Sequence, residues 1–261
     1  MTVQEIIDAI EQKAPLAYQE EWDNSGLQVG NRHAVVTGVL LCTDATEAVM
    51  AEAIGRGCNL VISHHPLIFR GIKHLVGDSV TERVVAAAVK HDVAVYSAHT
   101  SMDYAPGGVS WHMAQRLAMT DVEVLEAHPA AGPQVGCGVV GNVEPTTVEH
   151  FVARCKAAFE ADGVRYSGDP RTRVTRVALC GGAGAFLADK AIAAGAQVFV
   201  SGDMKYHDFL EKNDRIVMVD VGHYESEHFT KEIFYDIIQK KSPNFAAAFA
   251  RQERNPINYI S

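Results

Sequence analysis

Two adjacent histidines follow a short apolar run in the first third of the chain. His64 and His65 come directly after residues 59–63, NLVIS, which predict a buried strand, and before Pro66. In an open α/β sheet, binding sites form at the carboxyl ends of strands because the loops converge there. Two neighbouring histidines on an irregular segment can point in different directions, so each can serve a different metal ion. The alternative is that one residue caps the strand end and the other is solvated.

A second group of polar side chains follows the next predicted strand. The run 93–98, VAVYSA, leads into His99, and Asp103 lies four residues further on. Imidazole nitrogen and carboxylate oxygen together suit Zn, Mn, Fe, Co or Ni. The alternative is a turn-forming aspartate beside a structural histidine. This alternative weakens because two successive strand ends both offer metal ligands.

The third group comes from the far end of the chain. His223 and Glu227 stand four residues apart at the start of a predicted helix, so both project from one helix face. The alternative is an acidic first turn that complements the helix dipole, a role that suits Glu225 better because it faces away from His223. The helix start also offers donors for an anionic ligand.

Together, these regions supply more ligands than one metal ion needs. A mononuclear site takes three protein ligands and keeps one open position. A larger set is enough for two ions if a carboxylate bridges them. The sequence therefore predicts two divalent ions, Zn, Mn, Fe, Co or Ni, held by His64, His65, Asp103, His223 and Glu227, with His99 in reserve.

A glycine-rich segment follows the predicted strand 174–180. The backbone amides of Gly181, Gly182 and Gly184 are candidates for binding a phosphate or another anion. Tight packing between strand and helix explains these glycines equally well. A complete G-x-G-x-x-G fingerprint and its acidic residue about 20 positions further on are missing, which argues against a Rossmann-type nucleotide binder.

Asp203, Lys205 and His207 follow another predicted strand, 197–201. Lys205 is a candidate for contact with an anionic substrate. His207 and His99 are candidates for proton transfer, because imidazole titrates near neutral pH. The alternative for Lys205 and His207 is that they hold the metal ligands in place without touching a substrate.

The elements that must position these residues alternate in an α/β rhythm. We expect two α/β halves with mixed sheets flanked by helices and the metal site in the cleft between them. The first half comprises residues 1–127 and 222–261, and the second comprises residues 128–221, divided at the turn cluster 128–133, HPAAGP. The predicted strands are 35–42, 59–63, 93–98, 135–143, 174–180, 197–201 and 216–221. The predicted helices are 1–10, 45–56, 80–91, 110–117, 147–161, 186–194, 204–212 and 224–240, and residues 100–109 are expected to be irregular.

Composition limits the partners. The chain has 261 residues with 48% hydrophobic and 21% charged side chains, as in a packed globular protein. A net charge of -9 without a clustered basic face argues against a nucleic-acid partner.

The five scattered cysteines favour buried thiols in a reducing compartment. The N-terminus lacks a basic leader, and no apolar run approaches the roughly 18 to 20 residues that span a bilayer. We therefore expect a cytoplasmic protein with no membrane partner.

Six motifs carry a resemblance to a known family. They are WDNSGLQVG at 22–30, SHHPLIF at 63–69, HT at 99–100 with Asp103, GGV at 107–109, SGDMKYHD at 201–208 and GHYESE at 222–227. The chain resembles the NGG-interacting-factor-three-like family, whose bacterial members are often labelled GTP cyclohydrolase I type 2 homologues. The resemblance covers nearly the whole chain, with the motifs in family order.

The resemblance implies a two-part α/β fold with a dinuclear metal site, assembled as a ring-shaped homohexamer. The family's metal ligands would fall on the five residues selected above. Some relatives carry an extra domain inserted mid-chain, and the short interval between Leu125 and Val135 leaves no room for it here.

Two functional hypotheses follow. The first is a metal-dependent hydrolase of the GTP cyclohydrolase type, in which an activated water opens the purine ring at C8 and formate is released. Its substrate would be a nucleotide or another phosphorylated small molecule, with Lys205 and the loop 181–184 as candidates for the triphosphate. The alternative is a non-catalytic metal-binding ring, either a metallochaperone or a regulatory assembly. A hydrolase should retain its metals during turnover, whereas a carrier should lose them readily and bind a protein partner.

Overall fold

The computed structural model describes residues 1–260 and divides into two units. Unit 1 comprises Met1–Met102 and Phe229–Arg254, and unit 2 comprises Asp103–His228 and Asn255–Ser261. The division therefore falls earlier than the expected turn cluster at 128–133. The cluster lies instead in the connection between two antiparallel strands, β5 (Thr120–His128) and β6 (Gly132–Thr147). It is a hairpin turn within unit 2, and the fold is the expected mixed α/β type.

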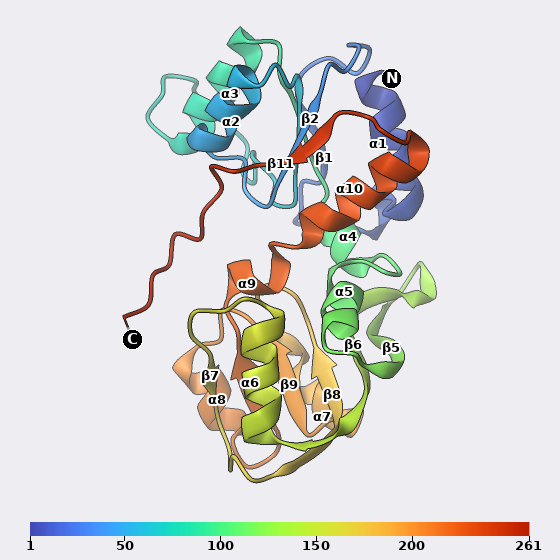
Figure 1. Cartoon of the computed structure of the whole chain (residues 1–261), viewed down its shortest axis with the longest axis vertical. Coiled ribbons are helices and arrows are strands. Elements are labelled where there is room, and N and C mark those ends of the chain that lie inside the picture. The colour runs from blue at the N-terminus through green and yellow to red at the C-terminus, as the bar shows by residue number, and fades with distance from the viewer. Residues whose placement is uncertain (261) are drawn as a thin grey trace. The chain divides into compact units, whose positions relative to one another are not determined.

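Unit 1 contains a five-stranded sheet in the order β1-β4-β3-β2-β11. Its strands are β1 (Gly26–Val29), β2 (Val39–Cys42), β3 (Leu60–Ser63), β4 (Ala94–Ser97) and β11 (Ala247–Phe249). All neighbouring pairs are parallel except β1 with β4, which is antiparallel. Figure 1 shows α2 (Glu47–Gly55) and α3 (Val80–Lys90) on one side of this sheet and α1 (Val3–Lys13) and α10 (Thr230–Lys241) on the other.

Helices on both faces explain why the central strands are continuously apolar. Every residue of β2, β3 and β4 is buried. Alternate side chains of these strands, Leu40, Val61 and Val95 among them, form one core with Met50 of α2 and Val84 of α3. Complete burial of one such aliphatic side chain contributes roughly 1.5–3 kcal/mol. Parallel strands covered on both faces have this pattern in general.

The register of the parallel strands decides which residues share an edge. Cys42 pairs with Ser63, and Ser63 pairs with Ser97, so β2, β3 and β4 end at the same level. The residues that follow these strands therefore lie along one edge of the sheet. This edge carries the segments 43–44, 64–65 and 98–99.

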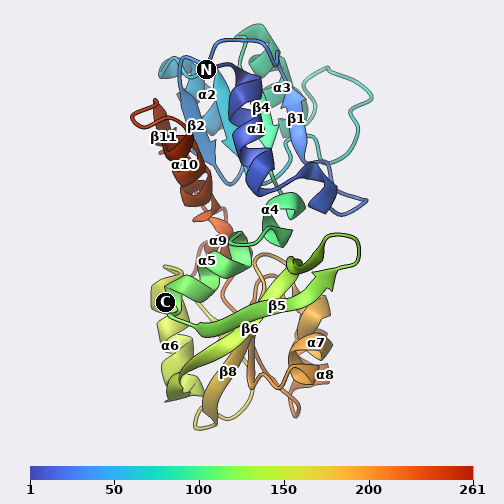
Figure 2. The same ribbon diagram turned by 90° about the vertical axis from the view of Figure 1, so that its right-hand side faces the viewer.

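Unit 2 contains a six-stranded sheet in the order β5-β6-β8-β9-β10-β7. The remaining strands are β7 (Arg165–Tyr166), β8 (Arg173–Leu179), β9 (Val198–Ser201) and β10 (Val217–Asp220). β8, β9 and β10 are parallel, whereas β5, β6 and β7 pair antiparallel with their neighbours. Figure 2 shows α6 (Val148–Ala158) on one side of the sheet and α7 (Ala188–Ala193) with α8 (Tyr206–Lys212) on the other.

Shorter elements complete the chain and correct two expectations. The stretch expected to be irregular contains α4 (Thr100–Tyr104), followed by α5 (Val109–Arg116). The helix expected over 224–240 is two helices, α9 (His223–Glu227) and α10. Two 3-10 turns are η1 (Leu16–Tyr18) and η2 (Ala185–Leu187). All five cysteines are free and buried.

Within residues 1–260, every helix is too short or too polar to serve as a transmembrane span.

Candidate metal centre

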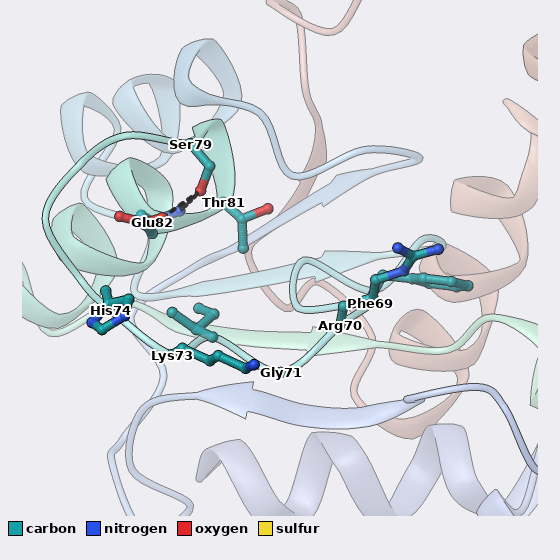
Figure 3. A pocket seen from close by; sticks show the side chains of 9 residues that line it. Phe69, Arg70, Gly71, Lys73, His74, Ser79, Thr81 and Glu82 are labelled. Atoms are coloured by element: carbon teal, nitrogen blue, oxygen red, sulfur yellow. Dashed lines mark hydrogen bonds between the residues drawn. The ribbon is translucent and has the colours of Figure 1, made fainter.

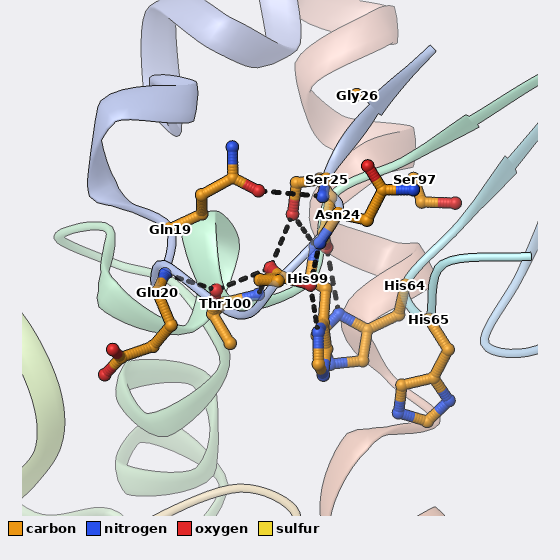
Figure 4. Close-up of polar contacts among 12 residues, drawn as sticks. Gln19, Glu20, Asn24, Ser25, Gly26, His64, His65, Ser97, His99 and Thr100 are labelled. Carbon is orange, nitrogen blue, oxygen red and sulfur yellow. Dashed lines mark hydrogen bonds and ion pairs between the residues drawn. The ribbon is translucent and has the colours of Figure 1, made fainter. Parts of the chain in front are cut away.

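Three histidines gather at the carboxyl edge of the unit 1 sheet. His64 and His65 follow β3, and His99 follows β4 (Figure 4). One nitrogen from each ring lies within 4.8 Å of the other two. The ring centroids of His64 and His65 are 4.9 Å apart, and that of His99 is 5.3 and 5.4 Å from them. We call His64, His65 and His99 the imidazole group.

His64 is completely buried and has a fixed tautomer. Its Nδ1 lies 3.0 Å from the carbonyl oxygen of Ala98. Because a carbonyl oxygen only accepts hydrogen bonds, Nδ1 must carry the proton and Nε2 must carry the lone pair. A lone pair on one imidazole nitrogen, with the other nitrogen donating to an oxygen, is the form in which histidine binds metals.

His65 is held in the same way by a carboxylate. Its Nδ1 lies 2.9 Å from Oδ1 of Asp44, in the segment that follows β2. The backbone amides of Thr43 and Asp44 both donate to Oε1 of Glu253, whose side chain is only 2% exposed. Glu253 also pairs with Lys231 of α10. A residue near the end of the chain thus fixes the loop that orients His65.

His99 is oriented by a buried acid, Asp23. Nδ1 of His99 lies 2.9 Å from Oδ1 of Asp23, whose side chain is fully buried. Asp23 also accepts from Thr100 and Ser25. Burial alone would raise the pKa of Asp23, but the hydrogen bonds from His99 and Thr100 bring it well below its ordinary value. An ionised acceptor therefore places the His99 proton on Nδ1. Pairing of β1 with β4 brings Asp23, just before β1, to this edge.

Unit 2 contains a fourth histidine with this arrangement. His223 begins α9, and its Nδ1 lies 2.8 Å from Oδ2 of Asp203, which follows β9. Asp220 of β10 pairs with Ser201 of β9, so both strands end beside the start of α9. On the other edge of the ring, Nε2 lies 3.0 Å from Oε2 of Glu227, one helical turn along. The Glu227 side chain is 3% exposed.

The contact between His223 and Glu227 tests whether a metal fits. With the proton on Nδ1, the lone pair of Nε2 faces a carboxylate oxygen. Two acceptors at this distance need a cation between them, either a second ring proton or a metal ion. The donor atoms, imidazole nitrogen and carboxylate oxygen, suit a divalent transition metal. The residues therefore fit a metal ion.

A second carboxylate joins this part of unit 2. One oxygen of Asp103, on α4, lies within 4.8 Å of a carboxylate oxygen of Glu227. Beside them, the hydrogen bond with Cys137, burial and the negative charges of Asp103 and Glu227 all raise the pKa of the Cys180 thiol. Two ionised acids this close repel each other, and a bound cation relieves that repulsion. We call Asp103, His223 and Glu227 the carboxylate group.

Comparison with known proteins places the chain in a family. The family model of Duf34/NIF3 (NGG1p interacting factor 3) matches residues 1–256. The chain belongs to this family. A GTP cyclohydrolase 1 type 2 homolog of Lactococcus lactis is 35% identical, with 88% of this chain and 89% of the relative covered. The protein of the same name from Streptococcus pneumoniae is 33% identical, with 89% of both chains covered.

A solved structure has the same fold as this chain. The crystal structure of Staphylococcus aureus protein SA1388 matches with a TM-score of 0.91 at 26% identity and covers 100% of this chain and 99% of its own. The fold of that protein thus agrees with the two mixed sheets described above. It also agrees with the fold class expected from the sequence.

The structure places all the predicted ligands of this NIF3-family chain in two groups. His64 and His65 lie together in unit 1 with the reserve residue His99. Asp103, His223 and Glu227 lie in unit 2. That all five ligands act together on two ions remains a prediction.

The candidate residues of α8 stay outside these groups. Lys205 and His207 are exposed at the start of the helix, and the His207 ring packs against Tyr206 with centroids 5.3 Å apart. In the described part of the chain, neither side chain forms a hydrogen bond or ion pair with His223 or Glu227. Their catalytic roles remain predictions.

The glycine segment packs against the carboxylate group. The amides of Gly181, Gly182 and Gly184 donate to hydroxyls of three serines, Ser110, Ser226 and Ser201. Gly182 has a φ of +59°, and a Cβ there would lie 2.3 Å from Oε1 of Glu227. The amides are already used inside the protein, which favours tight packing over an anion site. Because Gly182 has no Cβ, the Glu227 carboxylate can occupy this space.

Sequence reasoning missed three residues that orient ligands. Asp44 follows β2, so the strand-end rule that selected His64 also applied to it. Asp23 lies in the WDNSG motif before an edge strand, between the exposed residues Trp22 and Asn24, so no local pattern singles it out. Glu253 acts from 209 residues away along the chain on the amide of Asp44, and no local pattern indicates it.

Proposed function

We propose that this NIF3-family chain binds two divalent metal ions and uses them in a hydrolysis of the GTP cyclohydrolase type. The proposed ligands are His64, His65, Asp103, His223 and Glu227. The observation that carries the proposal is shared by the three histidine ligands: each has Nδ1 within 3.0 Å of an oxygen acceptor. A histidine held in this way presents the Nε2 lone pair to a metal.

The charges of the donor set support this assignment. The imidazole group consists of nitrogen donors, whereas Asp103 and Glu227 add two negative charges. Glu227 is almost completely buried beside His223, and a cation close to a buried carboxylate offsets the cost of removing its charge from water. Mixed nitrogen and oxygen ligation suits Zn, Mn, Fe, Co or Ni.

Divalent ions in such a site lower the pKa of water and polarise an electrophilic centre. The protein's own residues then have two tasks. His99 is the candidate proton carrier, because Asp23 holds its Nδ1 and leaves Nε2 to accept or deliver a proton. Asp44 and Asp203 keep His65 and His223 in the tautomer that binds metal.

The choice of GTP as the substrate rests on the name of the relatives. Proteins 33–35% identical over most of their length are named GTP cyclohydrolase 1 type 2 homolog. In a GTP cyclohydrolase reaction, water adds to C8 of the purine and the five-membered ring opens to a formamide. A second water then hydrolyses the formamide, and C8 leaves as formate. Lys205 and His207 stay candidates for substrate contact and proton transfer.

The proposal is tested by metal analysis and product analysis on the same preparation. We expect about two ions per chain by elemental analysis, as a dinuclear site requires. Protein loaded in turn with Zn, Mn, Fe, Co and Ni is then incubated with GTP, and formate and a pterin-type product are measured. Formate with any metal supports the activity. Two retained ions without formate under every condition would refute the hydrolase, and metal loss on dilution would support a metal carrier.

A further inference from the structure

Unit 1 contains a cavity of about 540 Å³ beside the segment that follows His65. Its lining includes Phe69, Arg70, Lys73 and His74 from this segment and Ser79 and Glu82 from the start of α3 (Figure 3). The figure shows Phe69 and Arg70 at one end of the drawn residues, His74 at the other and Lys73 between them. Three basic side chains thus line one cavity of an acidic protein.

These basic side chains lack acidic partners within residues 1–260. Arg70, Lys73 and His74 form no ion pair and no side-chain hydrogen bond there. Arg83, on the adjoining helix, shows the contrast: its Nε and Nη2 bind both carboxylate oxygens of Glu47, at 2.9 and 3.0 Å. Cationic groups without a protein counterion, gathered in a cavity, favour an anionic ligand.

The one acid that lines the cavity has another function. Oε2 of Glu82 accepts from the amides of Val76, Gly77 and Asp78, and Oε1 accepts from the Ser79 hydroxyl. These hydrogen bonds hold the pKa of Glu82 below its ordinary value. Glu82 therefore fixes the loop in front of α3 and forms no ion pair with the three basic side chains.

An exposed aromatic pair lies between this cavity and the imidazole group. Phe69 packs against Trp22 with centroids 5.8 Å apart, and the two rings lie 6.2 and 5.9 Å from the His99 ring. Trp22 is 58% and Phe69 48% exposed. Asn24 donates to the carbonyl of Ile68 at 2.6 Å, which fastens the two segments together. Rings exposed to this extent offer a stacking surface for a planar heterocycle.

We propose that this region is a nucleoside triphosphate subsite. Arg70, Lys73 and His74 bind the phosphates, and Trp22 and Phe69 stack against the base, which places the base beside His99. This inference rests on the proposed function, which supplies the identity of the reaction. Binding at this subsite needs no metal. The proposed subsite assigns phosphate binding to residues 70–74 in place of Lys205 and the loop 181–184, which the sequence suggested.

The phosphate half is tested with inorganic tripolyphosphate. Calorimetric titration is done on metal-free full-length protein in the presence of a chelator. We expect the double variant Arg70→Glu/Lys73→Glu to bind at least about tenfold more weakly than the parent, because each change replaces attraction by repulsion. The control is Lys90→Glu/Lys156→Glu, which makes the same change in net charge at exposed sites outside the cavity. An equal loss in both double variants, or no binding to the parent protein, would overturn the subsite.

The aromatic half is tested with GTP on the same protein. Replacing Trp111 by Phe leaves Trp22 as the one tryptophan, and GTP should quench its fluorescence. Trp22→Leu should weaken GTP binding but leave tripolyphosphate binding unchanged. If this variant binds GTP as well as the parent does, or if it loses affinity for both ligands, the base contact is contradicted.

The metal content of Arg70→Glu/Lys73→Glu should match that of the parent protein. If the parent protein binds the anion but holds no metal, only the metal proposal is refuted. If it holds its metals but does not bind the anion, only the subsite is refuted.

Discussion

In unit 1 the candidate ligands are three imidazoles, whereas in unit 2 they are one imidazole and two carboxylates. The imidazole group follows parallel strands that end in register, and its rings are held by a carbonyl and two acids. The carboxylate group comes from two short helices, and its histidine is held by one exposed aspartate. The two groups therefore differ in both charge and support.

This difference indicates how the two groups divide the work. Neutral imidazole nitrogens favour transition metals as ligands, but they carry no charge. They therefore do not neutralise the positive charge of a divalent ion. Asp103 and Glu227 supply the negative charge that divalent ions need. On the proposed function, a charge removed from unit 2 should therefore weaken binding more than a hydrogen bond removed from either unit. The predictions below follow that order.

The largest effect is expected for Glu227→Gln. This change keeps the shape of the side chain but removes a ligand and a negative charge, so at least one ion per chain should be lost on dialysis. The loss should exceed the roughly 10- to 100-fold weakening caused by losing a supporting residue. Glu225→Gln is the matched control, since Glu225 is also buried on α9 and accepts from Asn255. Retention of both ions by Glu227→Gln, or equal loss in the control, would remove Glu227 from the ligand set.

The sequence predicted the parts of the fold that depend on local pattern. β2, β3 and β4 are fully buried and lie inside the predicted strands, although the strand predicted over 35–42 begins only at Val39. α2 and α3 were predicted to within two residues at each end. The candidate ligands His64 and Asp103 and the reserve residue His99 were selected because they follow such strands. Strand-end chemistry and α/β periodicity are both local signals.

What the sequence did not predict depends on contacts between distant segments. β1, β7 and β11 are two to four residues long and sit at or near sheet edges, so they leave no periodic pattern. β5 has a mixed, half-exposed pattern and is defined by its pairing with β6. The break between α9 and α10 falls inside a continuous helical period. Glu253 reaches Asp44 only in the folded chain.

An intermediate effect is expected for the acids that hold the histidine rings. Asp44→Asn and Asp203→Asn should each weaken metal binding by roughly 10- to 100-fold. The Nδ1 atom of each histidine must donate a hydrogen bond, and the asparagine side chain can place its own NH2 donor opposite that atom. Competition with a chromogenic chelator measures this affinity. Asp23→Asn provides the contrast: it holds His99, the candidate proton carrier, so turnover should fall while two ions remain bound. Metal loss from Asp23→Asn would show that His99 is a ligand.

The smallest effect is expected where unit 1 is fastened to its C-terminal segment. Glu52 of α2 accepts from the amides of Arg251 and Gln252, both at 2.8 Å, and from Arg56. Burial alone would raise the pKa of Glu52, but these donors bring it below its ordinary value. The segment they hold leads to Glu253, which fixes the loop of His65. The imidazole group therefore depends on this contact.

Glu52→Gln should lower the free energy of unfolding by about 1 kcal/mol at pH 7, because the amide keeps one acceptor oxygen but loses the charge. A carboxyl whose pKa is lower in the folded state stabilises the protein above its unfolded value of about 4.3, and this contribution is lost as the pH falls. The difference between parent and variant, measured by urea unfolding, should therefore shrink below about pH 4. Glu21→Gln, at an exposed carboxyl without a hydrogen bond in the described chain, should show no difference at either pH. A gap between parent and Glu52→Gln that widens in acid would contradict this role of Glu52.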